Sequence, residues 1–278
     1  MESYTHDRLT FDVTDSGPSD GRVVIALHGF PEDRHCWERI TPSLTEAGYR
    51  VLAPDQRGYS PSARPVGRRS YIASNLNRDV LALADSVGAD RFDVVGHDWG
   101  GFVAWDLAAR HPDRIRSVTS LSTPHPQAAR DAMLHSTQLL HSWYMGFFQL
   151  PWVPEKVLGW RGGNQGAQVL QRAGLDEATA KRYAVRLATP GAMTGPLNWY
   201  RAFPLGPRDR TPNVGVPALY VWSDGDRFLT RAAAEGTANY MTGPYRFEVL
   251  VGQNHWLPTN AAAQIAPLLL GHLASVSQ

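Results

Sequence analysis

The sequence predicts an α/β protein with a mostly parallel, doubly wound sheet that is interrupted by a helical insertion. Short apolar runs alternate with amphipathic stretches, the pattern of strands buried between two layers of helices. This alternation stops near residue 124 and resumes near residue 213. The intervening residues are rich in aromatic side chains and contain no clear strand pattern. We therefore expect a core of residues 1–123 and 213–278, with a helical cap of residues 124–212.

The core before the insertion has the stronger pattern. Continuous apolar runs predict strands at residues 23–27, 49–53, 91–95 and 115–121. Apolar residues at three- and four-residue spacing predict a helix over residues 72–87, on the evidence of Leu76, Val80, Leu83 and Val87. A second helix is expected over residues 100–110.

After the insertion, a segment rich in Pro, Gly and Arg at residues 205–212 is expected to return the chain to the core. The same kind of alternation then predicts strands at 217–222 and 246–251, and helices at 230–240 and 260–274. The whole pattern is that of one interrupted α/β domain.

Composition narrows the classes of function. Of the 278 residues, 27 are Lys or Arg and 26 are Asp or Glu, so the formal net charge is only +1. Such a balance does not favour a nucleic-acid partner or an anionic membrane. The polar N-terminus is unlike a signal peptide, and no apolar run approaches the roughly 18 residues that span a bilayer. The lone Cys36 excludes an internal disulfide. We expect a cytoplasmic protein with no membrane partner, metal or other cofactor.

One glycine-rich motif stands between a predicted strand and a predicted helix and has the form of a nucleophile elbow. It reads Gly96-His97-Asp98-Trp99-Gly100-Gly101. An elbow holds its central residue on a sharp turn, and small residues on either side let the strand and the helix approach closely. The centre is usually serine, but here it is Asp98. A carboxylate can displace a leaving group at a saturated carbon and form an ester without a base to activate it.

A second short motif, His28-Gly29-Phe30-Pro31, follows the first buried strand. In hydrolases with a nucleophile elbow, a loop at this place donates one backbone N–H to an oxyanion, and the residue after the nucleophile donates another. The predicted oxyanion donors are therefore Phe30 and Trp99.

Hydrolysis of an ester on Asp98 needs a base. His255 lies after the last predicted strand and before the last helix, so the chain order of nucleophile, acid and histidine is satisfied. The acid should follow the preceding strand, where Asp224 and Asp226 are candidates. We choose Asp226, which would hold the imidazole and stabilise its charged form.

Seven ordered motifs together resemble the epoxide hydrolases of the α/β-hydrolase fold. They lie at residues 28–32, 55–60, 96–101, 122–125, 148–151, 198–201 and 254–256. The resemblance implies that two cap tyrosines donate to the epoxide oxygen as the ring opens. Tyr200, in Asn198-Trp-Tyr-Arg201, matches one of them, and Tyr144, shortly before Phe148-Gln-Leu-Pro151, matches the other. A phenol with a pKa near 10 can donate at neutral pH.

The resemblance also implies a small apolar epoxide as substrate, because aromatic side chains crowd the cap sequence. We expect substrate contacts from His28, Pro31, Phe147 and Trp199. The product would be a vicinal diol.

Two alternatives are a haloalkane dehalogenase and a hydrolase-fold protein that binds a ligand without turning it over. Dehalogenases of this branch commonly hold halide with an Asn after His-Gly, where this chain has Phe30, which has no side-chain donor. Fluoroacetate dehalogenases carry an arginine after the nucleophile, where this chain has Trp99. Non-catalytic relatives usually lose a triad residue, and all three are present here.

Overall fold

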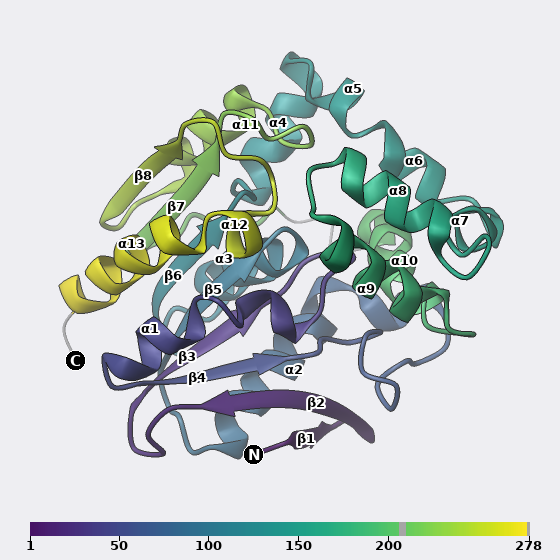
Figure 1. Cartoon of the computed structure of the whole chain (residues 1–278). Helices are drawn as coiled ribbons and strands as arrows, with labels where there is room; N and C mark the ends of the chain where they lie inside the picture. Colours follow the sequence, from purple (N-terminus) through teal and green to yellow (C-terminus); the bar gives the residue numbers. More distant parts are fainter. Residues whose placement is uncertain (206–209, 277–278) are drawn as a thin grey trace.

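A computed structural model describes residues 1–205 and 210–276 of the chain (Figure 1). Their strands form one eight-stranded sheet in the order β1-β2-β4-β3-β5-β6-β7-β8. The strands β3 to β8 are parallel to one another. The strand β2 pairs antiparallel with β4, and β1 pairs antiparallel with β2. The bounds are β1 (Ser3–His6), β2 (Leu9–Ser16), β3 (Arg22–Leu27), β4 (Tyr49–Pro54), β5 (Phe92–His97), β6 (Ile115–Leu121), β7 (Ala218–Ser223) and β8 (Tyr245–Leu250).

The six predicted strands are present, with ends that differ by two residues or fewer. The hairpin of β1 and β2 was not predicted from the sequence. In β2 only alternate residues such as Phe11 and Val13 are buried, so the strand lacks the continuous apolar run of a strand covered on both faces. Val13 pairs with Pro54 of β4 at the edge of the parallel strands.

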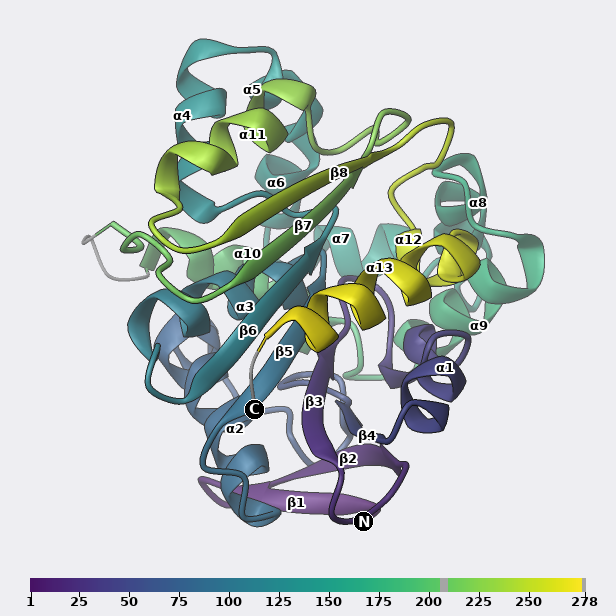
Figure 2. The same ribbon diagram turned by 90° about the vertical axis from the view of Figure 1, so that its left-hand side faces the viewer.

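Helices cover both faces of the sheet, as Figure 2 shows. One face carries α2 (Ala73–Ser86) and α3 (Trp99–Arg110), and the other carries α1 (Thr41–Glu46) and α13 (Ala262–Ser275). Their apolar sides form two separate clusters of buried residues on the two faces. The remaining short elements of the core are η1 (Arg34–Trp37), η2 (Arg68–Tyr71), α11 (Arg231–Gly236), η4 (Thr237–Tyr240) and α12 (Leu257–Asn260).

Two predicted helices are subdivided. The helix expected over 230–240 is α11 followed by the 3-10 turn η4, and the change comes next to Gly236, a poor helix former. The helix expected over 260–274 is α13, which the short α12 precedes.

Between β6 and β7 the elements of the described part are helices joined by loops, and Val214 near the end makes an isolated bridge to Met241. The elements are α4 (Pro126–His135), α5 (Gln138–His141), α6 (Trp143–Phe148), α7 (Val153–Leu158), α8 (Asn164–Arg172), α9 (Glu177–Ala188), α10 (Thr194–Ala202) and η3 (Phe203–Leu205). Helix α4 lies against α11 and η4. At η4, the Tyr240 hydroxyl bonds to Asp131, and the ring of His125 stacks on that of Tyr240. Within the predicted return segment 205–212, residues 206–209 lie outside the described residues.

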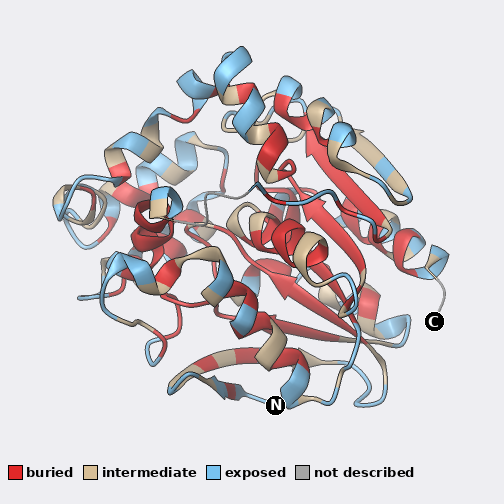
Figure 3. Cartoon of the chain, turned by 180° about the vertical axis from the view of Figure 1, so that it is seen from behind, coloured by how far each residue is buried: buried red, intermediate tan, exposed pale blue. Residues whose placement is uncertain are grey.

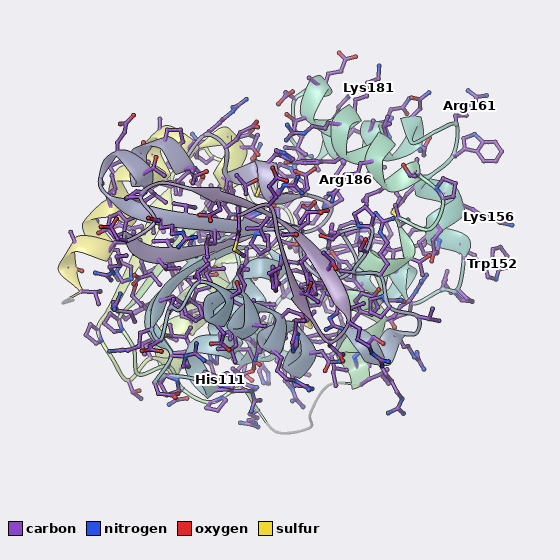
Figure 4. All side chains as sticks on the ribbon, turned by 90° about the horizontal axis from the view of Figure 1, so that it is seen from below. His111, Trp152, Lys156, Arg161, Lys181 and Arg186 are labelled. Carbon is purple, nitrogen blue, oxygen red and sulfur yellow. The ribbon has the colours of Figure 1, made fainter. Side chains whose placement is uncertain are left out.

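The helices α5 to α10, which we call the cap, sit over the carboxyl ends of the parallel strands (Figure 1). Arg186 of α9 fixes them to the core, because its guanidinium lies 2.9 Å from Asp55 and 3.3 Å from Asp33. The central strands are buried, and the outer faces of these helices are exposed (Figure 3). In Figure 4 the side chains of Trp152, Lys156 and Arg161 point outward from this group of helices. In the described part of the chain, no helix combines the length and apolarity needed to cross a bilayer.

Candidate active site

Asp98 occupies the sharp turn between β5 and α3. Its backbone has φ 50° and ψ −119°, which is a strained conformation for a residue other than glycine. The turn is tightly enclosed: a Cβ added to Gly100 would overlap the Leu27 carbonyl, and one added to Gly29 would overlap the Asp98 side chain. The turn and the loop after β3 therefore pack as one unit at the carboxyl edge of the sheet, where open α/β sheets bind ligands.

The carboxylate of Asp98 accepts a hydrogen bond from a predicted oxyanion donor. The Phe30 N–H donates to Asp98 Oδ1 at 2.8 Å. Trp99, the other predicted donor, directly follows Asp98 as the first residue of α3. Its ring packs edge-on against Tyr200, with 5.0 Å between the ring centres.

The structure brings together the three residues predicted as a triad. His255 Nε2 lies 3.6 Å from Asp98 Oδ2, and His255 Nδ1 lies 2.8 Å from Asp226 Oδ2. The other oxygen of Asp226 accepts from the N–H groups of Phe228 and Leu229 at 2.8 and 3.0 Å, which fixes the carboxylate. Asp224 instead accepts from the Gly252 N–H at 2.7 Å.

The charges around His255 and Asp98 shift the pKa values of these two residues. Burial alone would lower the pKa of His255, but the charge and hydrogen bond of Asp226, followed by those of Asp98, raise it to about 10. Burial alone would raise the pKa of Asp98, but His255, His97 and the Phe30 N–H outweigh burial and lower it. At neutral pH, His255 is therefore an imidazolium between the carboxyl groups of Asp98 and Asp226.

Two tyrosines face Asp98 from the cap. Tyr144 belongs to α6 and Tyr200 to α10, and their ring centres are 6.0 Å apart. Burial, and then the negative charge of Asp98, raise the pKa of both phenols well above the usual value. Both hydroxyls therefore stay protonated at neutral pH and can act as hydrogen-bond donors.

A cavity of about 600 Å³ lies between these tyrosines and Asp98. Most of its lining is aromatic or aliphatic, which suits a ligand with an apolar body. The lining includes Phe30, Pro31, Asp98, Leu140, His141, Trp143, Tyr144, Phe147, Phe148, Val157, Leu158, Val169, Leu170, Arg172, Ala173, Tyr200, Arg227, Phe228, His255 and Trp256.

Of the four predicted substrate contacts, Pro31 and Phe147 line this cavity. His28 is fully buried behind the loop, with Nδ1 2.9 Å from the Gly29 carbonyl oxygen and Nε2 accepting from the Gln56 N–H. The Trp199 ring borders a second cavity and donates to the Arg57 carbonyl. Within residues 1–205 and 210–276, neither His28 nor Trp199 lines the active-site cavity.

Sequence reasoning predicted neither the contact between Glu32 and His97 nor the place of Phe228 in the site. Glu32 and His97 are fully buried: His97 Nδ1 lies 2.7 Å from Glu32 Oε2, and His97 Nε2 lies 2.8 Å from the His255 carbonyl oxygen. Glu32 also accepts from the Gly29 N–H at 3.0 Å. The pair thus connects the loop after β3 to the loop that carries His255. Glu32 and His97 could have been suspected from the sequence, because both lie inside motifs described above. Phe228 has no such signal, but its ring lies between those of Tyr144 and His255, at 5.6 and 4.9 Å.

Comparisons with known proteins identify the family of the chain. Residues 22–260 match the family model of the alpha/beta hydrolase fold. The chain is 36% identical to the AB hydrolase superfamily protein YfhM of Bacillus subtilis and 31% identical to epoxide hydrolase A of Mycobacterium tuberculosis, and each alignment covers 95% of this chain and 94% of the relative. The crystal structure of epoxide hydrolase A from Mycobacterium thermoresistibile superposes with a TM-score of 0.86 at 26% identity, over 99% of this chain and 98% of that one. The chain therefore belongs to the epoxide hydrolase family of the α/β-hydrolase fold.

Proposed function

We propose that the protein hydrolyses a small apolar epoxide to a vicinal diol through an ester on Asp98. One observation carries the proposal: a carboxylate aligned with His255 and Asp226 faces two protonated phenols across an apolar cavity. The names of the relatives support the choice of substrate class. No cofactor is needed for this chemistry.

The first half of the reaction is alkylation. An oxygen of Asp98 attacks an epoxide carbon, the ring C–O bond breaks, and its electron pair stays on the ring oxygen. Tyr144 and Tyr200 donate to that oxygen, and one of them gives it a proton as the charge develops. The imidazolium of His255 then returns a proton to the tyrosinate through solvent, so that a neutral imidazole faces a neutral ester.

Ester formation also changes what His255 can do. The negative charge of Asp98 contributes to the raised pKa of His255, and this contribution disappears once the carboxylate is esterified. His255 then takes a proton from water, which attacks the ester carbonyl. The N–H groups of Phe30 and Trp99 would stabilise the resulting oxyanion. Collapse breaks the ester C–O bond, and the departing alkoxide takes the proton of the hydroxyl that water added to the Asp98 carboxyl carbon. The diol is thus released, and Asp98 is again a carboxylate beside the imidazolium.

The covalent intermediate gives a direct test. In His255→Gln, alkylation should proceed and hydrolysis should stop, so mass spectrometry should show the protein plus one substrate mass. His111→Gln is a suitable control, because His111 ends α3 on the side of the core away from the cap (Figure 4). An unmodified His255→Gln protein, under conditions where the wild type turns over, would contradict the covalent route.

Isotope labelling tests which oxygen enters the product. In a single turnover in heavy-oxygen water, the diol should be largely unlabelled and Asp98 should carry the label, because water attacks the ester carbonyl. Label that appears directly in the diol would mean that water attacks the epoxide. Release of halide from a haloalkane, with no diol from any epoxide, would favour the dehalogenase alternative.

A further inference from the structure

Three successive carbonyl groups at the end of helix α8 accept hydrogen bonds from side chains of the core. A helix leaves its last carbonyls without partners inside the helix, and local residues or water usually supply them. Here the donors come from segments more than fifty residues away. The bonds run from Arg227 Nη1 to the Arg172 carbonyl (2.8 Å), from Trp256 Nε1 to the Ala173 carbonyl (2.9 Å), and from Asn254 Nδ2 and Asn260 Nδ2 to the Gly174 carbonyl (3.0 and 2.9 Å).

These donors flank the triad residues. Asn254 and Trp256 stand on either side of His255, and Arg227 follows Asp226. Figures 1 and 2 both show α8 and α9 beside α12, the helix that the histidine loop enters. The turn between α8 and α9 is therefore attached to the two loops that carry the base and its acid.

Asn254 differs from the other donors because it also holds the histidine loop itself. Its Oδ1 accepts from the Trp256 N–H at 3.1 Å, a bond that spans His255. Its own carbonyl accepts from Ser223 Oγ at 2.9 Å, and the His255 carbonyl accepts from Ser122 Oγ at 2.8 Å. The main chain on either side of the base is thus fixed to the core, while the Asn254 amide joins it to the cap.

We propose that Asn254 is a positioning residue: by bracketing His255 and holding the α8–α9 turn, it sets the imidazole in place for the hydrolytic half of the reaction. This inference rests on the proposed function, in which His255 directs water at the ester on Asp98. Alkylation needs the Asp98 carboxylate and the two phenols, and Asn254 touches none of these groups. Hydrolysis instead requires the imidazole to aim a water molecule, and misplacement by about 1 Å can cost about 100-fold.

The test compares Asn254→Ala with Asn260→Ala. Both residues donate to the Gly174 carbonyl, and Asn260 Nδ2 also donates to Asn254 Oδ1 at 3.0 Å. Asn260 does not adjoin His255, and without Asn260 the Asn254 amide keeps its bonds to Trp256 and Gly174, so Asn260→Ala is the comparison variant. Rapid quenching followed by mass spectrometry resolves formation and decay of the ester. We expect ester decay to slow by about 10- to 100-fold in Asn254→Ala, with alkylation within about twofold of wild type, so that ester accumulates during turnover. In Asn260→Ala, alkylation should stay within about twofold of wild type, and ester decay should slow much less than in Asn254→Ala, because Asn254 loses only one of its contacts.

The pH profile of ester decay provides a readout that a purely structural role would not change. Asp226 raises the pKa of His255. In the ester, Asp226 stays bonded to His255 Nδ1, His97 stays beside the ring at 4.8 Å between ring centres, and Tyr144 and Arg227 line the same cavity. If loss of Asn254 lets the ring move from Asp226, the midpoint of the profile should shift to lower pH in Asn254→Ala and stay in place in Asn260→Ala.

Gly174→Ala tests the same contact from the cap side. Gly174 has φ +104°, and an added Cβ would overlap Asn254 Nδ2. This variant should slow ester decay as Asn254→Ala does, and it replaces that variant if Asn254→Ala does not fold. Equal effects of Asn254→Ala and Asn260→Ala, or equal slowing of alkylation and ester decay, would overturn the inference. Absence of any ester in His255→Gln would instead overturn the proposed function.

Discussion

The core and cap halves of the active site are built from different interactions. In the core, Asp98, His255 and Asp226 follow strand ends and are joined by short directional contacts of 2.8 to 3.6 Å. In the cap, Tyr144 and Tyr200 are held mainly by the edges of other rings, such as Phe148 at 5.7 and 4.8 Å between ring centres. Edge-to-face contacts tolerate small shifts better than hydrogen bonds do.

This difference assigns separate tasks to the two halves. The core half fixes charge and protonation, whereas the cap half shapes an apolar space and presents two donors. The charge of Asp98 couples them, because it contributes to the raised pKa of His255 on one side and of both phenols on the other. In the proposed reaction, ester formation removes that charge. Its removal lowers the pKa of His255, so that the imidazole can act as a neutral base, and it also lowers the pKa of each phenol.

The largest effect should come from the core. Asp226→Asn keeps the size of the side chain but cannot stabilise the imidazolium, and we expect ester decay to slow by about 10³- to 10⁴-fold, as for other triad acids. Asp224→Asn is the matched control: its Oδ1 can still accept from Gly252, so its rate should stay within about twofold. Single-turnover assays measure both. The reverse ranking would move the acid to Asp224.

Changes in the cap should have an intermediate effect, confined to alkylation. Tyr144→Phe or Tyr200→Phe should slow alkylation by about 10- to 1000-fold, because a positioned donor contributes about 10² to 10⁴ and one phenol can partly replace the other. The double variant should be much slower than either single variant. Tyr183→Phe, a change of another buried cap tyrosine, is the control. Epoxide opening at close to the wild-type rate in the double variant would refute the assignment, since only halide departure needs no proton.

The smallest effect concerns the stability of the fold, to which His255 and the two phenols contribute in different pH ranges. The folded pKa of His255, about 10, exceeds the unfolded value of about 6.5, so the folded state binds more protons between these values. The contribution is complete below pH 6.5 and is lost as the pH rises through 10. The raised phenol pKa values lower stability only above about pH 10. Melting temperature should therefore fall less from pH 6.5 to 10 in Asp226→Asn than in wild type, and an equal fall would contradict the His255 assignment.

Local sequence patterns predicted the parallel strands and the turn that carries Asp98. Continuous apolar runs located the parallel strands, and small residues around Asp98 located the turn. Chain order then selected His255 and Asp226 as candidates, and the structure brings His255 Nδ1 within 2.8 Å of Asp226 Oδ2. The antiparallel hairpin escaped prediction because its strands are half-polar and have no apolar run.

Contacts between distant segments account for the rest. His28 sits in a motif beside the cavity, yet its ring turns inward to Gln56, and no local pattern encodes that direction. The same holds for Phe228 and for the bonds from Asn254 to Gly174, which exist only after the cap docks on the core. Side-chain direction and docking depend on the assembled fold, so spacing along the chain does not reveal them.

The enclosure of Asp98 also determines where substrate range can be engineered. Because Gly29 and Gly100 leave no space for a Cβ, libraries randomised at these two glycines would consist mostly of misfolded members. Leu140, Val157 and Val169 line the opposite wall and are 72%, 43% and 44% exposed, so larger or smaller side chains fit there without displacing packed neighbours. Selection for new epoxides should therefore enrich changes in the cap and leave the elbow unchanged.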